Sequence, residues 1–403
     1  MKLLWISHFL LYPDTGYGAL QRSRNLLKAL SKYHEIHLIC LYRDSDRSLV
    51  PDVNIAEDDL KKYCETVTII PHPLSSHKLI GLLMKSFLTK VPLSTYIYRS
   101  ESMVHAIERI TSKNHIDVIH ADTLGMIEPL FHKLTQKKVL THHDIESHKM
   151  SRRIKNEKNI LKQIVFKHEY NCIYEYENKY CKKFDLNLTV SEVDCERLRE
   201  IHGDINTEVI ENGVDCDYFK YYPGNYNSKE LIFMGALDYY PNTNAMQYFC
   251  SDIWPLLKKK HPEVSFTIIG KNPSSQLLTI VNAHEDIRIV GFVDDVRPYL
   301  REASIFVCPI MEGGGTRIKI LDAFAQGIPV ISTDVGAEGL NVKNGKQIIL
   351  ANSITEFVDG ISTLMEREEL FEAISLNARK FVEDCYSYGH IGRKMATLFE
   401  TLF

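Results

Sequence analysis

Four polar residues with helical spacing could together bind a charged ligand. Lys319, Asp322 and Gln326 follow one another at intervals of three and four, which places them on one face of a helix, and Arg317 is expected just inside the start of that helix. Two cations suit a diphosphate, and a carboxylate one turn further along suits a ribose or sugar hydroxyl. The alternative is a charged face that contacts only solvent.

The elements around these residues favour the ligand site. An apolar run at 305–308 predicts a buried parallel strand. A turn of small residues follows, then a helix capped by Thr316 and ended by Gly327, and a second strand at 330–332. This order directs free backbone amides and the positive end of a helix toward the carboxyl edge of a sheet. The residues of the turn are Gly313, Gly314 and Gly315.

The segment GGGTRIKILDAFAQGIPVIST resembles the donor-site signature of the retaining GT-B glycosyltransferases of family 4. That family carries a Glu-x7-Glu motif, in which Asp322 takes the place of the second acid and Gly314 that of the first, with Glu312 two residues earlier. The family's Arg and Lys after the first strand of the C-terminal domain are missing here, where the sequence reads FMGALDYYPN. We expect Arg317 and Lys319 to act in their place.

Three more glycines mark turns at the ends of predicted strands. Gly235, Gly270 and Gly291 each stand where the backbone turns sharply or approaches a ligand. The resemblance implies that the loop at Gly270, together with Gly291, Phe292 and Val293, surrounds the base of a nucleotide. An ordinary turn glycine is the alternative at each position.

In the first half of the chain, His143 follows a predicted strand at 139–141. Ligands bind at this edge of open parallel sheets. The resemblance matches THHD to a His-Asp pair that contacts the donor sugar, with His143 as the matching histidine, while the role of His142 stays open. A glycine loop with Gly16 and Gly18 precedes the first helix and can approach a ligand closely. An ordinary first crossover is its structural alternative.

Apolar runs separated by helical stretches predict an α/β fold with parallel sheets. The resemblance implies the GT-B fold: two Rossmann-like domains facing a cleft, with a C-terminal helix crossing back. We expect an N-terminal acceptor-side domain at 1–214, a nucleotide-sugar donor domain at 215–384 and the returning helix at 385–403. The predicted strands are 3–6, 36–41, 67–70, 118–120, 139–141, 186–190, 231–234, 264–269, 287–290, 305–308, 330–332 and 348–350.

Composition narrows the class of protein. The 403 residues are 44% hydrophobic and 25% charged, with a net charge of −4, which is typical of a globular protein and argues against a nucleic-acid binder. Nine cysteines without a Cys-x-x-Cys pair argue against disulfides or a zinc site and favour a cytoplasmic enzyme. The basic, partly apolar segment 149–167 is either a solvated helix or a contact with the inner face of a membrane.

We therefore expect a metal-independent retaining hexosyltransferase that moves a sugar from a UDP- or GDP-sugar to a hydroxyl of a glycan, lipid-linked or protein-linked acceptor. Arg317, Lys319 and His143 are the expected catalytic residues. The nucleotide sugar is a co-substrate, and no cofactor or nucleic acid is expected. A GT-B nucleotide-sugar epimerase and a non-catalytic nucleotide-sugar-binding partner of an active transferase are the alternatives. The residues expected to bind the donor are Gly16, Gly18, Gly235, Gly270, Gly291, Phe292, Val293, Glu312, Gly313, Gly314, Gly315, Thr316 and Asp322.

Overall fold

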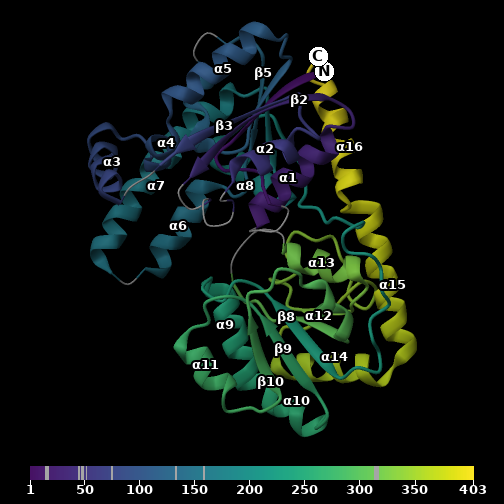
Figure 1. The fold of residues 1–403 in the computed structure, drawn as a ribbon. Helices are drawn as coiled ribbons and strands as arrows, with labels where there is room; N and C mark the ends of the chain where they lie inside the picture. The colour runs from purple at the N-terminus through teal and green to yellow at the C-terminus, as the bar shows by residue number, and fades with distance from the viewer. Residues whose placement is uncertain are drawn as a thin grey trace. The chain divides into compact units, whose positions relative to one another are not determined.

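Two parallel β-sheets organise the chain, each in a unit with its own core. The computed structural model describes residues 1–13, 18–43, 46, 50, 52–73, 76–131, 134–157, 159–312 and 317–403. Residues 1–211 together with 391–403 form the N-terminal unit, and residues 212–390 form the C-terminal unit (Figure 1). The expected boundaries after 214 and 384 lie a few residues from these limits.

The N-terminal unit contains a seven-stranded sheet in the order β3-β2-β1-β4-β5-β6-β7, with every neighbouring pair parallel. Its strands are β1 (Lys2–Ser7), β2 (Glu35–Arg43), β3 (Thr66–His72), β4 (Val118–Ala121), β5 (Lys137–Thr141), β6 (Leu186–Thr189) and β7 (Thr207–Val209). Its helices are α1 (Gly18–Leu30), α2 (Val53–Leu60), α3 (Ser76–Thr89), α4 (Leu93–Tyr98), α5 (Glu101–Lys113), α6 (Glu146–Asn156), α7 (Ile160–Tyr180) and α8 (Glu192–His202).

The C-terminal unit contains a six-stranded parallel sheet in the order β10-β9-β8-β11-β12-β13. Its strands are β8 (Glu230–Met234), β9 (Ser265–Ile269), β10 (Ile287–Gly291), β11 (Ile305–Cys308), β12 (Val330–Ser332) and β13 (Ile349–Leu350). Its helices are α9 (Tyr240–Tyr248), α10 (Trp254–Lys260), α11 (Ser275–Val281), α12 (Arg297–Glu302), α13 (Ile318–Gln326), α14 (Ile354–Glu366) and α15 (Glu368–Cys385).

The sheet order places the candidate site. In the C-terminal unit the first strand, β8, lies in the middle of the sheet, between β9 and β11, so the chain winds outward in both directions from it. Ligands of open parallel sheets bind at the carboxyl ends of the strands where this reversal occurs. The loops after β8 and β11 therefore flank the binding position that this topology predicts.

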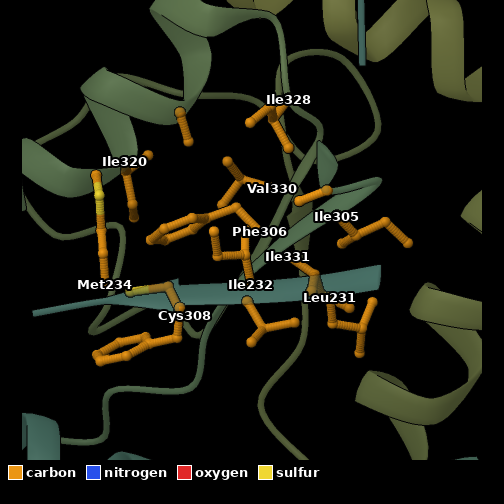
Figure 2. Packing of buried hydrophobic residues seen from close by; sticks show 14 of the residues in the cluster. Leu231, Ile232, Met234, Ile305, Phe306, Cys308, Ile320, Ile328, Val330 and Ile331 are labelled. Atoms are coloured by element: carbon orange, nitrogen blue, oxygen red, sulfur yellow. The ribbon is translucent and has the colours of Figure 1, made fainter. Parts of the chain in front are cut away.

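A continuous apolar core supports these loops. Figure 2 shows side chains of β8, β11 and β12 packed together, with Ile320 of α13 above them. Ile232, Phe306 and Ile331 are fully buried, as expected for strands covered on both faces. Helix α13 is thus held on the sheet by its apolar side, and its position fixes the polar residues on its other side.

The last helix, α16 (Tyr388–Glu400), ends in the N-terminal unit. A Cβ at Gly392 would lie 2.3 Å from the Cβ of Ala29, so α16 crosses α1 at a distance that only glycine permits. The α/β fold with two Rossmann-like parallel-sheet units is confirmed. Strand β7 was not predicted, because its sequence Thr-Glu-Val, with an exposed Glu208 in the middle, contains no apolar run.

Candidate active site

Helix α13 presents the predicted cations at the carboxyl edge of the C-terminal sheet. Arg317 was expected just inside the helix, but it is the N-cap residue, with an extended backbone (φ −81°, ψ 92°). Its side chain is buried, and Nη2 donates to the Glu312 carbonyl at 3.4 Å. Gly327 ends the helix in the left-handed conformation, with φ of 88°, as the sequence predicted.

Lys319 is held by two contacts from other elements. Its Nζ donates to Oδ1 of Asn242 at 2.8 Å and lies 4.3 Å from the centre of the Phe233 ring. Asn242 is buried in α9, and its Nδ2 donates in turn to the Ala236 carbonyl at 2.8 Å. The ammonium group therefore has a defined position beside the loop that follows β8.

Gly235 is required by this arrangement. A Cβ at that residue would lie 2.5 Å from Nζ of Lys319 and 2.8 Å from Nδ2 of Asn242. A Cβ at Gly270 would lie 2.1 Å from the Gly235 carbonyl oxygen, so the loops after β8 and β9 also pack closely. Gly291 closes β10 with φ of 87°, a backbone conformation that favours glycine. The three predicted glycines thus stand at the ends of three neighbouring strands.

Of the other residues expected to bind the donor, some lie in described segments and five do not. Phe292 is 68% exposed after β10, and Val293 packs partly against the core. Oε1 of Glu312 accepts from Nδ2 of Asn244 at 2.5 Å. Gly18 is the first residue of α1. Five residues named from the sequence lie outside the described residues: Gly16, Gly313, Gly314, Gly315 and Thr316.

Lys319 and Asp322 have strongly shifted pKa values. Burial, aided by the charge of Arg317, lowers the pKa of Lys319 to about 8. Burial also raises the pKa of Asp322 to about 8, although the charge of Lys319 acts in the opposite direction. Both side chains are partly exposed, whereas Gln326 is fully buried and does not share their access to the surface. The predicted polar stripe therefore consists of Lys319 and Asp322.

A second group of polar residues gathers at the carboxyl edge of the N-terminal sheet. His143 follows β5, and its Nε2 donates to Oδ1 of Asp122 at 3.1 Å. Asp122 follows β4 and is almost fully buried, and its other oxygen accepts from Oγ of Ser23 in α1 at 2.7 Å. The His143 ring is 19% exposed. A buried carboxylate thus fixes a histidine that solvent can reach.

Two histidines near Asp122 are uncharged at pH 7, whereas Asp122 is ionised. Burial lowers the pKa of His8 to about 3 and that of His120 to about 4, so both are neutral at pH 7. Burial alone would raise the pKa of Asp122, but His143 and the hydrogen bonds to its carboxylate lower it overall. His142 is buried, and its ring contacts Asn187 at 3.2 Å, which places it in the core of the unit.

Sequence reasoning missed three of the residues that shape these groups. Asp122 has the same signal as His143, since each is a polar residue two positions after a predicted apolar strand. Asn242 is the last residue of FMGALDYYPN, the segment where the family's cations are missing, and Asn244 lies two residues beyond it. Their roles depend on contacts with residues 77 and 68 positions away, which no local pattern reveals.

No helix within the described part of the chain has the length and apolar character needed to cross a bilayer. Across the same described ranges, no three His, Cys, Asp or Glu residues gather closely enough to hold a metal ion.

Similarity to known proteins covers nearly the whole chain. A protein from the cps region of Klebsiella pneumoniae is 21% identical over 96% of both chains. A phosphatidyl-myo-inositol mannosyltransferase of Mycobacterium leprae is 23% identical over 48% of this chain and 53% of its own. Among solved structures, sucrose-phosphate synthase from Thermosynechococcus elongatus has a TM-score of 0.71 at 16% identity, covering 100% of this chain and 99% of its own. Anabaena HepE in complex with UDP has a TM-score of 0.65 at 15% identity, covering 100% of both chains.

Two family profiles divide the chain between them. The profile "Glycosyltransferase Family 4" matches residues 16–218, which is half of the chain and falls almost wholly in the N-terminal unit. The profile "Glycosyl transferases group 1" matches residues 228–367 of the C-terminal unit, including α13 and the glycine-rich strand ends. These matches agree with the two Rossmann-like units, and the chain belongs to glycosyltransferase family 4.

Proposed function

We propose that this glycosyltransferase transfers a hexose from a UDP- or GDP-sugar to a hydroxyl of a glycan, lipid-linked or protein-linked acceptor, with retention of configuration. The solved HepE structures contain UDP and UDP-glucose, and several relatives are mannosyltransferases. Two of these relatives are named for phosphatidyl-myo-inositol and for the lipopolysaccharide core, which supports a lipid-linked acceptor.

The fixed position of Lys319 is the observation that carries this proposal. Its ammonium is held by Asn242 at the carboxyl edge of the sheet, beside two strand ends where only glycine fits. An ammonium has three N–H donors, and the bond to Asn242 uses one of them. Lys319 can therefore donate to a diphosphate without losing the contact that positions it.

The reaction needs little covalent chemistry from the protein. As the bond between the anomeric carbon and the diphosphate breaks, negative charge grows on the departing phosphate oxygens. Cations held in place before the reaction stabilise that charge without reorganising. We assign this role to Lys319 and Arg317, and we assign Asp322 to a ribose or sugar hydroxyl. Because burial favours the protonated form of Asp322, its carboxyl group can donate a hydrogen bond as well as accept one.

His143 is assigned to the donor sugar. The bond from its Nε2–H to Asp122 fixes the ring and leaves Nδ1 as an acceptor in the neutral form. A sugar hydroxyl could donate to that nitrogen. Asp122 is a positioning residue in this scheme, because it acts on the sugar only through His143.

Turnover of a nucleotide-sugar panel tests the proposal. The purified protein is incubated with UDP-glucose, UDP-galactose, UDP-N-acetylglucosamine and GDP-mannose, and free nucleotide and sugar are measured. Slow hydrolysis of one donor, abolished in Lys319→Ala, is the expected result. Interconversion of sugars would indicate an epimerase instead, and binding without turnover would indicate a non-catalytic partner. NMR of the first sugar released tests the stereochemistry, since an inverted anomeric centre would contradict retention.

A further inference from the structure

Exposed apolar side chains are concentrated on two helices of the N-terminal unit. Of the twenty large apolar side chains that are exposed among the described residues, seven lie on α3 and the first turns of α7. Leu88 and Leu161 are the two most exposed of all, at 83% and 75%. Isolated apolar residues are ordinary on protein surfaces, but such a concentration marks an interaction site. The seven residues, which we call the α3–α7 surface, are Ile80, Met84, Phe87, Leu88, Ile160, Leu161 and Ile164.

The two helices bring these side chains into one surface. On α3 the apolar residues recur at intervals of three and four, so they form one stripe along the helix. On α7 a similar stripe runs from Ile160 through Ile164 to His168. The rings of Phe87 and His168 stack with centroids 3.9 Å apart, and Oγ of Ser86 lies 3.3 Å from Nε2 of His168. The stripes therefore meet where the helices touch. Figure 1 shows α3, α6 and α7 on the same side of the N-terminal unit.

Positive charge surrounds the α3–α7 surface. No acidic residue occurs between Glu65 and Glu101, a stretch that contains all of α3. Residues 149–167, a range that includes parts of α6 and α7, carry seven lysines and arginines and one acid, Glu157. The chain as a whole has a net charge of −4, so this positive region lies on an otherwise acidic protein. The exposed basic side chains of the region include Lys78, Lys85, Arg153, Lys155, Lys162 and Lys167.

We propose that the α3–α7 surface docks on an anionic lipid bilayer. The apolar side chains enter the boundary between headgroups and acyl chains, and the surrounding lysines and arginines contact lipid phosphates. Amphipathic helices that lie in a membrane interface have this combination of an apolar face and a basic rim. A second copy of the chain is a poorer occupant, because it would bring two positive regions together, and lysine is depleted from protein–protein interfaces.

Docking would serve the acceptor side of the reaction. A lipid-linked acceptor keeps its acyl chains in the bilayer, so an enzyme held on the surface meets it at high local concentration. This benefit depends on the proposed lipid-linked acceptor, whereas the docking itself does not. The two ideas can therefore fail separately.

Vesicle sedimentation tests the docking. The full-length protein is mixed with vesicles of phosphatidylcholine alone or of phosphatidylcholine with 30% phosphatidylglycerol, and the sedimenting fraction is measured. We expect binding to the anionic vesicles that weakens as salt is added. Lys162→Gln and Lys167→Gln should each weaken it about fivefold, because each basic residue near an anionic bilayer contributes about that factor. The double variant Leu88→Glu, Leu161→Glu should abolish it.

Matched controls lie on α15 of the C-terminal unit. Leu376 is 59% exposed and Lys380 is also exposed. Leu376→Glu and Lys380→Gln therefore make the same chemical changes at exposed residues that do not belong to the α3–α7 surface. Both should bind vesicles as the unmodified protein does, and all variants should keep its melting temperature. Absence of binding by the unmodified protein, or equal binding by the leucine variant, would overturn the proposal. A dimer in light scattering that the leucine variant dissociates, without vesicle binding, would assign the surface to a second copy.

Discussion

The contact between Asn242 and Lys319 gives a quantitative test of the proposed chemistry. If Lys319 stabilises the departing diphosphate, removing its ammonium should lower turnover far more than it weakens donor binding. If Asn242 acts only by positioning that ammonium, its removal should matter only while Lys319 is present. Both statements concern the same 2.8 Å bond, so a double-mutant cycle measures them together.

The expected magnitudes follow from the contacts. A charge-stabilising donor in an active site contributes about 3–4 kcal/mol, so Lys319→Ala should reduce kcat by a hundredfold or more. A hydrogen bond to a charged group contributes about 1.5–3 kcal/mol. Asn242→Ala should therefore reduce kcat by roughly tenfold to a hundredfold, with Phe233 still beside the ammonium at 4.3 Å. In the double variant, the second change should add less than about 0.5 kcal/mol to the first.

Steady-state kinetics on the donor that the panel identifies provide the assay. Each variant must keep the melting temperature of the unmodified protein, since Asn242 also supports the loop at Ala236. Gln247→Ala, five residues along α9, is the matched control for a change on this helix that does not touch Lys319, because the Gln247 side chain bonds Ser274 instead. The reasoning is refuted if the losses in the double variant multiply, or if folded Lys319→Ala retains near-normal turnover.

Three further predictions concern the same reaction. Asp122→Asn should lower kcat about tenfold or more with little change in the KM of the donor, since it removes the charged acceptor that orients His143. His143→Ala should lower kcat at least as much. A large rise in KM alone would contradict a positioning role for Asp122. The plot of kcat/KM against pH should fall as pH rises through about 8, because the Lys319 ammonium loses its proton there, and Lys319→Arg should remove this fall, whereas Asp322→Asn should not. EDTA should leave turnover unchanged, because Arg317 and Lys319 can neutralise the diphosphate; loss of activity that Mg²⁺ or Mn²⁺ restores would show that a metal is required.

Local sequence determined the layered architecture of this protein. Buried parallel strands consist almost wholly of apolar residues, so the runs at 231–234, 305–308 and 330–332 predicted strands without tertiary information. Gly327 ended α13 for a local reason, since the left-handed conformation there favours glycine. Strand β7 could not be predicted in this way, because Thr207, Glu208 and Val209 form no apolar run and the strand is defined by its pairing with β6.

The candidate site was predictable in part, for the same reason. His143 and the cations of α13 stand next to strongly patterned elements, and parallel strands bring their carboxyl ends to one edge of a sheet. The sequence alone could therefore identify these residues as candidates for the site. Their assigned roles remain predictions until the donor and the variants are measured.

Only the tertiary structure decided which side chains control these residues. The Asp122 carboxylate joins Ser23 and His143 from three segments, and Asn242 reaches Lys319 across 77 positions of sequence. The shifted pKa values of Lys319 and Asp322 likewise arise from burial, which depends on how loops and helices pack around them. Patterns of three or four residues report the local backbone, whereas hydrogen bonds and desolvation depend on distances in space. That difference is why the elements could be predicted from the sequence and the environment of the charges could not.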